Sequence, residues 1–237
     1  MTSSNLPEKF SSDGRIRSIN PRSLEIVGSV EATPVDTLPE RITQARTAQQ
    51  IWAEHSPTER AEALAPALER VVARRDELAA LLGREHGKST TEAMFSEVLG
   101  AAEVLRVHMK EDPRWLQSEK VKLDPLSYPG KRARVEHIPR GVIAAVMPWN
   151  YPLALPMRTI VPALIAGNAV LFKPSEHSVL VGAAIGELFD GLLPEGLLQV
   201  LQGGAELGAA LVEGFSDAEL REDLGVRPIG HRNLLVV

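Results

Sequence analysis

The chain has 237 residues, 44% of them hydrophobic, which is enough for a core in one or two domains. Its formal net charge of −5 argues against nucleic acid or an anionic membrane surface as a partner. Because it contains no cysteine, disulfides, cysteine-based metal sites and a cysteine nucleophile are excluded within these residues.

Residues 1–37 are expected to form an N-terminal arm. They lack the cationic segment and apolar core of a signal peptide, and no apolar run is long and unbroken enough to cross a membrane, so we expect a cytoplasmic protein. Ile16 to Ile19 and Leu24 to Val27 are candidate strands. A loosely ordered arm is an equally good interpretation, because the segment is rich in Ser, Pro, Asp and Gly.

From Leu38 to Met109 the apolar residues keep helical spacing, which predicts a series of helices. Ser56 and Glu59 form a capping box that starts one helix, and Pro66 is expected to kink it. Later signals are Gly87 as a helix end, Ser89 with Glu92 as a second capping box, and Pro113 as the final stop.

The charged residues along these helices are interpreted as solvated faces, and Met94 and Met109 as core fillers. The next regular segment, Arg132 to Ile138, alternates charged and apolar residues as a half-exposed strand does. Its basic residues fit an exposed strand edge better than a nucleic-acid site, because the protein is acidic overall.

The segment from Gly141 to Glu176 organises the rest of the chain. Val142 to Met147 is an apolar run without a polar face, which predicts a strand buried on both sides. Leu153 to Ile165 is predicted as a buried, bent helix that Gly167 ends, and Asn168 to Lys173 as a second buried strand. Two strands joined by a helix are the building block of a parallel sheet, so the predicted fold class is α/β.

Polar side chains follow both predicted strands at the point where each strand ends. Asn150 comes just after the first strand, and Lys173, Ser175 and Glu176 stand at the end of the second. In open α/β sheets, ligands bind outside the carboxyl ends of the strands. These residues are therefore the candidates for a binding site.

Three separated motifs carry a family resemblance: Pro-Trp-Asn-Tyr-Pro at 148–152, Gly-Asn at 167–168 and Lys-Pro-Ser-Glu at 173–176. With them the sequence resembles the aldehyde dehydrogenase superfamily, and a weaker resemblance extends from about Leu38 to about Phe215. The resemblance implies that residues 141–216 form a Rossmann-like parallel sheet that binds NAD, with NADP as the alternative cofactor. It also implies that residues 38–140 form a helical layer and the start of a projecting hairpin used for oligomer contacts, so a homo-oligomer is expected.

The chain continues past Glu176 into a second unit. Ser178 is predicted to cap a helix that runs through Phe189, followed by a third strand at Leu197 to Leu201 and a third helix at 205–212. The glycines at 203 and 204 lack the spacing of a dinucleotide fingerprint. The resemblance nonetheless implies that they lie near the pyrophosphate of the cofactor.

The resemblance ends at Asp217. Residues 217–237 form a tail that does not match the family pattern, and both the glutamate base and the cysteine loop of the family are missing. We therefore expect an incomplete cofactor domain in a truncated or frame-shifted chain that is inactive by itself.

Asn150 is the catalytic candidate. The resemblance implies that its side-chain amide stabilises the oxyanion that forms when a thiolate attacks an aldehyde. The alternative is that Asn150 caps the helix that follows it.

The cofactor-binding candidates are Trp149, Lys173, Pro174, Ser175 and Glu176. The resemblance implies that Glu176 accepts hydrogen bonds from the ribose hydroxyls, that Lys173 donates to the same region, and that Trp149 and Pro174 line the groove. The alternatives are core packing for Trp149 and Pro174, and ordinary strand-end and helix-start positions for Lys173 and Glu176. Ser175 is open between a cap and a ligand.

The resemblance thus implies oxidation of a small-molecule aldehyde to an acid with NAD or NADP. The alternative is a non-catalytic nucleotide-binding or interaction module that retains this segment. No metal is expected, because the six histidines show no metal-like spacing.

Overall fold

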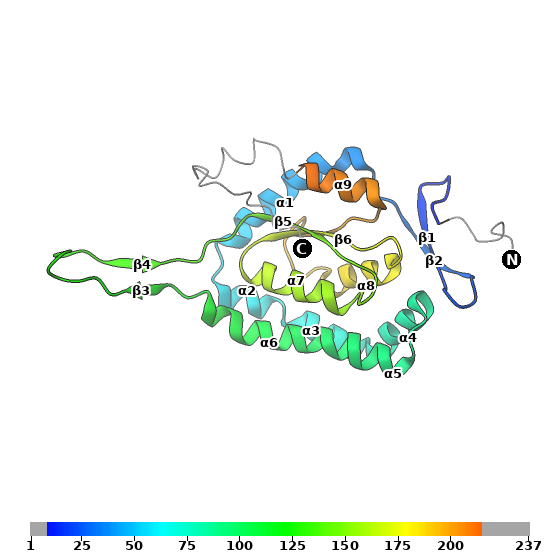
Figure 1. Cartoon of the computed structure of the whole chain (residues 1–237), viewed down its shortest axis with the longest axis horizontal. Helices are drawn as coiled ribbons and strands as arrows, with labels where there is room; N and C mark the ends of the chain where they lie inside the picture. The colour runs from blue at the N-terminus through cyan, green and yellow to red at the C-terminus, as the bar shows by residue number, and fades with distance from the viewer. Residues whose placement is uncertain (1–8, 215–237) are drawn as a thin grey trace.

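The computed structural model describes residues 9–214, which form a parallel sheet between layers of helices (Figure 1). Helices α1 (Leu38–Ala53) and α9 (Ala205–Gly214) lie on one face of the sheet. Helices α7 (Ala154–Ile165) and α8 (Val179–Phe189) cover the other face. The predicted α/β fold class is confirmed, and the predicted tail at 217–237 lies outside the described residues.

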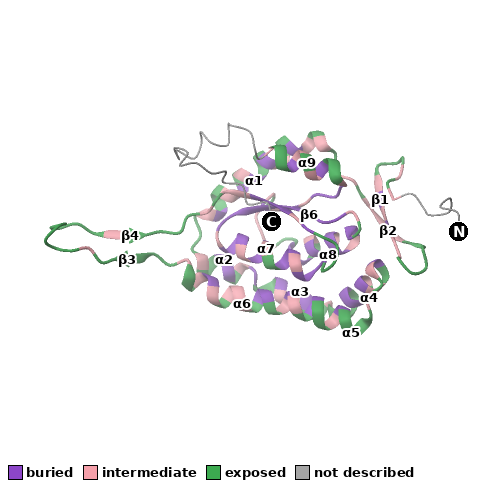
Figure 2. Ribbon diagram, viewed as in Figure 1, coloured by how far each residue is buried: buried purple, intermediate pink, exposed green. Residues whose placement is uncertain are grey.

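The sheet has three parallel strands in the order β5 (Val142–Val146), β6 (Ala169–Lys173) and β7 (Leu198–Val200). All five residues of β6 are buried, as the apolar run predicted, and Figure 2 shows the strand in the buried colour. Gly167 ends the turn after α7 with a φ of +88°, a conformation that glycine adopts without steric cost. The predicted strand–helix–strand unit is confirmed.

A short 3₁₀ turn, η1 (Val35–Thr37), precedes α1. An outer layer of helices packs against α7 and α8 on the side away from the sheet (Figure 1). The elements of this layer are α2 (Pro57–Ala63), α3 (Ala65–Ala73), α4 (Arg75–His86), α5 (Thr90–Glu92), the π-helical segment η2 (Ala93–Val98) and α6 (Leu99–Trp115).

The helix signals in this layer hold with four differences. Only half of the predicted second capping box forms: the Ser89 hydroxyl accepts from the backbone N–H of Glu92 at 3.2 Å, but the Glu92 side chain does not bond back to the Ser89 backbone. The capping box at Ser56 and Glu59 is present, and Gly87 ends α4 with a φ of +71°. Pro66 separates α2 from α3 rather than bending one helix, and a further break at Arg74 has no glycine or proline to mark it. The stop predicted at Pro113 is wrong: α6 runs on to Trp115, because a proline in the last turn removes few of the helical hydrogen bonds.

The interpretation of the helical charges as solvated faces is wrong for several residues of the outer layer. Arg60 is 5% exposed, Glu85 is 3% exposed and Glu97 is fully buried. Each of these side chains hydrogen-bonds to the backbone of the sheet-covering helices or of their flanking turns: Arg60 Nε donates to the carbonyl oxygen of Ile165 at 2.7 Å. Met94 and Met109 pack against the core as predicted.

Two hairpins flank the body of the protein (Figure 1). The first pairs β1 (Arg15–Ile19) with β2 (Ile26–Glu31) and packs against α8. Both candidate strands of the N-terminal arm are thus present within the described residues, the second shifted toward the C-terminus by two residues at its start. The second pairs β3 (Glu119–Val121) with β4 (Ala133–Val135) and projects far from the body. The strand predicted at 132–138 is thus shorter than expected, and residues 38–140 hold both strands of the projecting hairpin rather than its start alone.

Within residues 9–214, no helix is both long enough and apolar enough to cross a membrane.

Gly182 provides a test of the packing between α8 and the turn after β6. A Cβ atom added at Gly182 would lie 2.5 Å from Cγ of Pro174, closer than two carbon atoms can approach. We predict that Gly182→Ala destabilises the protein by roughly 1–2 kcal/mol, because overpacking costs more than the helix propensity of alanine returns. Urea unfolding measures the change.

Gly208→Ala is the matched control, since its added Cβ would lie 3.5 Å from Cε of Lys173, an ordinary contact. This variant should be neutral or stabilising. Equal effects of the two substitutions would contradict the packing argument.

Candidate functional site

The carboxyl ends of β5 and β6 lie side by side. Val146 is the register partner of Lys173, and the backbone N–H of Met147 donates to the carbonyl oxygen of Lys173 at 2.9 Å. The loop at 148–152 and the turn at 174–178 therefore leave the same edge of the sheet, as the sequence predicted for its two polar clusters.

A cleft of about 480 Å³ opens between this edge and α9. Its lining residues are Val146, Lys173, Gly204, Ala205, Gly208, Ala209, Val212 and Glu213. Among the predicted site residues only Lys173 lines it, and its aliphatic stem lies against Gly208. The sequence indicated the glycines at 203 and 204 but gave no signal for Gly208. Gly204 lies just before α9, and its carbonyl oxygen accepts from the backbone N–H of Gly208 at 3.2 Å.

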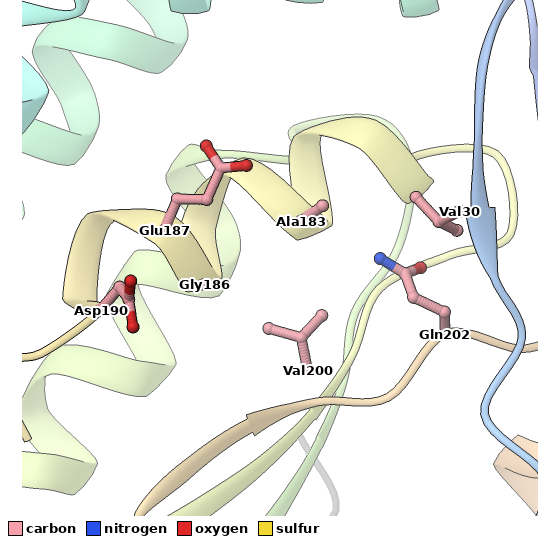
Figure 3. Close-up of a pocket in the computed structure, with 7 residues that line it drawn as sticks. All are labelled: Val30, Ala183, Gly186, Glu187, Asp190, Val200 and Gln202. Carbon is pink, nitrogen blue, oxygen red and sulfur yellow. The ribbon is translucent and has the colours of Figure 1, made fainter. Parts of the chain in front are cut away.

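A second hollow, of about 280 Å³, lies between α8, β7 and β2 (Figure 3). Its walls are mainly apolar side chains such as Val30 and Val200, with Glu187 and Asp190 at one end. None of the predicted site residues lines it. The cleft at the carboxyl ends of the strands is therefore the better candidate, because it holds a buried lysine.

Asn150 is exposed in the middle of the loop that follows β5. Its backbone carbonyl oxygen accepts a hydrogen bond from Nζ of Lys88 at 2.9 Å. Its side-chain amide makes no hydrogen bond to any residue between 9 and 214. Trp149, next to it, is 58% exposed, so core packing does not account for that side chain.

Glu97 takes the role that the alternative interpretation gave to Asn150. Oε2 of Glu97 accepts hydrogen bonds from the backbone N–H groups of Leu153 at 3.1 Å and Ala154 at 2.9 Å, at the start of α7. The capping interpretation of Asn150 is therefore wrong. No local signal marks Glu97, because it lies 56 residues before Leu153 in the sequence.

Lys173 is 4% exposed, and its Nζ donates to the carbonyl oxygen of Pro174 at 3.3 Å. Burial lowers the pKa of Lys173, and the nearby Glu176 carboxylate opposes this by favouring the charged form. The lysine thus places its side-chain nitrogen at the cleft with little exposure to solvent.

The other residues of the turn have different environments. Pro174 is buried against Gly182, so its contacts match the core-packing alternative. Ser175 accepts a hydrogen bond from the backbone N–H of His177 at 3.2 Å. Glu176 is half-buried, and its Oε1 lies 3.9 Å from Nε2 of His177.

The prediction that Ser178 caps α8 with its side chain is wrong. Glu85 does this instead: its two carboxylate oxygens accept hydrogen bonds from the backbone N–H groups of Leu180 and Val181, both at 2.9 Å. Burial raises the pKa of Glu85, and these two hydrogen bonds oppose the rise. Glu176 therefore precedes α8 without capping it.

The family model described as the aldehyde dehydrogenase family matches residues 9–216. The chain belongs to the aldehyde dehydrogenase family. It is 34% identical over 203 residues to a 4,4'-diapolycopene aldehyde oxidase from Methylomonas, a match that covers 85% of this chain and 38% of that protein.

Solved structures of aldehyde dehydrogenases share the fold. An aldehyde dehydrogenase from Brucella melitensis biovar abortus superposes with a TM-score of 0.80 and 32% identity, over 87% of this chain and 42% of that one. An NADP-dependent glyceraldehyde-3-phosphate dehydrogenase from Bacillus halodurans, solved with NADP, gives a TM-score of 0.77 and 33% identity, over 84% and 42%. The chain thus spans about two fifths of the length of these proteins.

No group of three or more His, Cys, Asp or Glu side chains between residues 9 and 214 is arranged to hold a metal ion.

The buried side chain of His86, next to Glu85 at the end of α4, leads us to predict that the stability of the protein depends on pH. Burial, and then the charges of Lys88, His177 and Lys9, lower the pKa of His86 to about 4 from an ordinary value of 6.5. The pKa of His86 is lower in the folded than in the unfolded state, so protonation favours the unfolded chain. The unfolding free energy is therefore highest above pH 6.5 and falls as the pH is lowered toward 4. We predict that His86→Gln flattens the fall in unfolding free energy over this range, measured by urea titration at several pH values.

His55→Gln, at an exposed histidine of the same helical layer, is the control and should leave the profile unchanged. A wild-type slope in the His86 variant would show that this imidazole is not the titrating group.

Proposed function

We propose that this chain forms the cofactor-binding and oxyanion-stabilising part of an aldehyde dehydrogenase that oxidises a small-molecule aldehyde to an acid with NAD or NADP. The observation that carries the proposal is the state of Asn150. Asn150 is exposed at the carboxyl edge of the sheet. Its side chain does not cap α7, because the Glu97 carboxylate accepts the hydrogen bonds from the backbone N–H groups at the start of that helix.

The chemical role of Asn150 follows from where charge develops. When a nucleophile attacks an aldehyde carbon, negative charge forms on the carbonyl oxygen, and a fixed N–H donor stabilises that charge. The Asn150 side chain is such a donor. The nucleophile is not among these 237 residues if it is a cysteine, as the family resemblance implies, because the chain contains none.

The proposed cofactor residues are Trp149, Lys173, Pro174, Ser175 and Glu176. Lys173 is buried and lines the cleft together with Gly204, just before α9, and Gly208, within it. This lining fits an anionic ligand that approaches the protein backbone closely, such as a dinucleotide. Glu176 accepts from ribose hydroxyls, and Trp149 forms an apolar wall. A nicotinamide cofactor held by these residues would supply the hydride acceptor for the oxidation.

Three further proposals follow from family membership. We propose that residues 141–216 form part of the dinucleotide-binding domain and that residues 38–140 form the helical layer and the projecting hairpin. The hairpin is proposed as the contact surface of a homo-oligomer in the cytoplasm. A non-catalytic nucleotide-binding module is the weaker proposal, because such a module would not require an exposed Asn150 amide that makes no hydrogen bond within residues 9–214.

We predict that this chain prefers NAD to NADP because of Glu176. Two unit charges about 4 Å apart repel by roughly 4 kcal/mol at an effective dielectric constant of 20, so a carboxylate at the ribose disfavours a 2′-phosphate. Lys173 and solvent offset part of this repulsion, so we expect NAD to bind about tenfold more tightly. Isothermal titration with each oxidised cofactor measures the ratio.

Glu176→Gln removes the charge and keeps the shape, so it should bring the two dissociation constants together. Glu187→Gln, at an exposed acid on the far end of α8, should leave the ratio unchanged. If the wild-type chain binds NADP as tightly as NAD, Glu176 is not the discriminating group. If neither cofactor binds, the proposed cofactor role of this segment fails.

We predict that the 237-residue chain by itself does not oxidise aldehydes. The reason is the absence of any cysteine to form the covalent adduct. The measurement is NADH or NADPH production from a panel of short aldehydes, read against a mock preparation from cells without the gene. Turnover that copurifies with the chain through two different columns would contradict the prediction.

A further inference from the structure

Lys88 lies in the turn between α4 and α5, close to the loop that carries Asn150. Gly87, with a φ of +71°, ends α4 and turns the chain at this point. The side chain of Lys88 is only 9% exposed, although lysine is almost never buried without a partner. Lys88 is therefore expected to have partners for its ammonium group.

The ammonium group of Lys88 has four partners. It forms ion pairs with Oε1 of Glu97 at 2.8 Å and with Oε1 of Glu92 at 3.5 Å. It donates to the carbonyl oxygen of Asn150 at 2.9 Å, and it lies over the ring of Tyr151, 4.4 Å from the ring centre. Two of these partners belong to the Pro-Trp-Asn-Tyr-Pro loop.

Glu97 connects the same ammonium group to the far end of the loop. One of its oxygens pairs with Lys88, and the other accepts from the backbone N–H groups of Leu153 and Ala154. The short segment from Asn150 to Ala154 is therefore held at both ends by one ion pair. Because the Glu97 side chain is fully buried and that of Lys88 is only 9% exposed, solvent screens their attraction little.

We propose that Lys88 is a positioning residue that fixes the main chain of Asn150, so that the side-chain amide points at the reacting carbonyl oxygen. The inference rests on the proposed oxyanion role of Asn150. A donor for developing charge works only when it is held in place before the reaction, and an error of about 1 Å costs about a hundredfold in rate. A loop that precedes a helix does not supply such rigidity by itself, whereas a buried ion pair bonded to both of its ends does.

The test follows the Asn150 side-chain amide directly, by NMR of the isotope-labelled chain. The Asn150→Asp variant assigns the signal by its loss. Lys88→Met removes the ammonium group and keeps the apolar stem. We expect the Asn150 amide signals to shift and broaden, and backbone amides at 150–155 to exchange with solvent at least tenfold faster, while signals of the β6 core keep their positions.

Glu92→Gln is the matched control, because it removes the weaker, exposed partner of Lys88 and leaves the contacts to Glu97 and Asn150 in place. It should leave the Asn150 signals and the exchange rates unchanged. Lys88→Arg keeps the charge and donors and should restore part of the protection. If Lys88→Met leaves the Asn150 amide unchanged, or if Glu92→Gln changes it equally, the proposal is wrong.

Lys88→Met leaves the buried Glu97 carboxylate without its ammonium partner and can unfold the chain. The double variant Lys88→Met/Glu97→Gln removes both charges and keeps an acceptor for the start of α7. If this variant folds and the Asn150 amide still shifts and broadens, the proposal holds. If it too is unfolded, Lys88 serves the stability of the fold and the positioning role is rejected. None of these measurements involves a cofactor. Their outcome therefore tests the role of Lys88 independently of the NAD and NADP titrations, which test cofactor binding.

Discussion

Two buried carboxylates of the outer helical layer hold the helices that lead away from the carboxyl edge of the sheet. Glu97 receives the first N–H groups of α7, and Glu85 receives those of α8. The N-terminus of a helix carries a partial positive charge and unpaired N–H donors, so each carboxylate satisfies both at once. The loop with Asn150 and the turn with Glu176 lie just before these anchored helix starts.

The two carboxylates are not equivalent in energy. A buried carboxylate costs several kcal/mol in lost hydration, which hydrogen bonds and an opposite charge offset. Glu97 has the ammonium group of Lys88 at 2.8 Å, whereas Glu85 has the imidazole of His86 at 3.7 Å and the charge of Lys9 in its surroundings. Because the pKa of His86 is lowered to about 4, that ring is neutral near pH 7 and offsets little. Burial therefore raises the pKa of Glu85, although its two backbone hydrogen bonds, the Ser18 side chain and the charge of Lys9 oppose the rise.

The arrangement also gives the helical layer a part in the site. The layer contributes no side chain to the lining of the cleft, yet Lys88 and Glu97 contact the loop on which the oxyanion proposal depends. The edge of the sheet fixes where the polar residues emerge, and the outer layer fixes how their backbone is held. The membership of the chain in the aldehyde dehydrogenase family agrees with this division, since the family match spans both the layer and the sheet.

The amino-acid sequence by itself determined the features that depend on neighbouring residues. Apolar runs without a polar face predicted β5 and β6, Gly167 and Gly87 marked two helix ends, and the box at Ser56 and Glu59 marked a helix start. The motifs around Asn150 and Lys173 also predicted that the two polar clusters leave the same edge of the sheet, as the pairing of Val146 with Lys173 shows. Each of these signals lies within a few residues of the structure that it predicts.

The tertiary structure alone decided which charged residues are buried and what they hold. Ser178 had the residue type and position of a cap, but the carboxylate of Glu85, 95 residues before Leu180, occupies that place. Asn150 had an equally good local reason to cap α7, and Glu97 left its amide uncommitted. The local sequence around a helical glutamate is the same whether its side chain faces water or packs against another helix. Only the tertiary packing of the layers decides between these two environments.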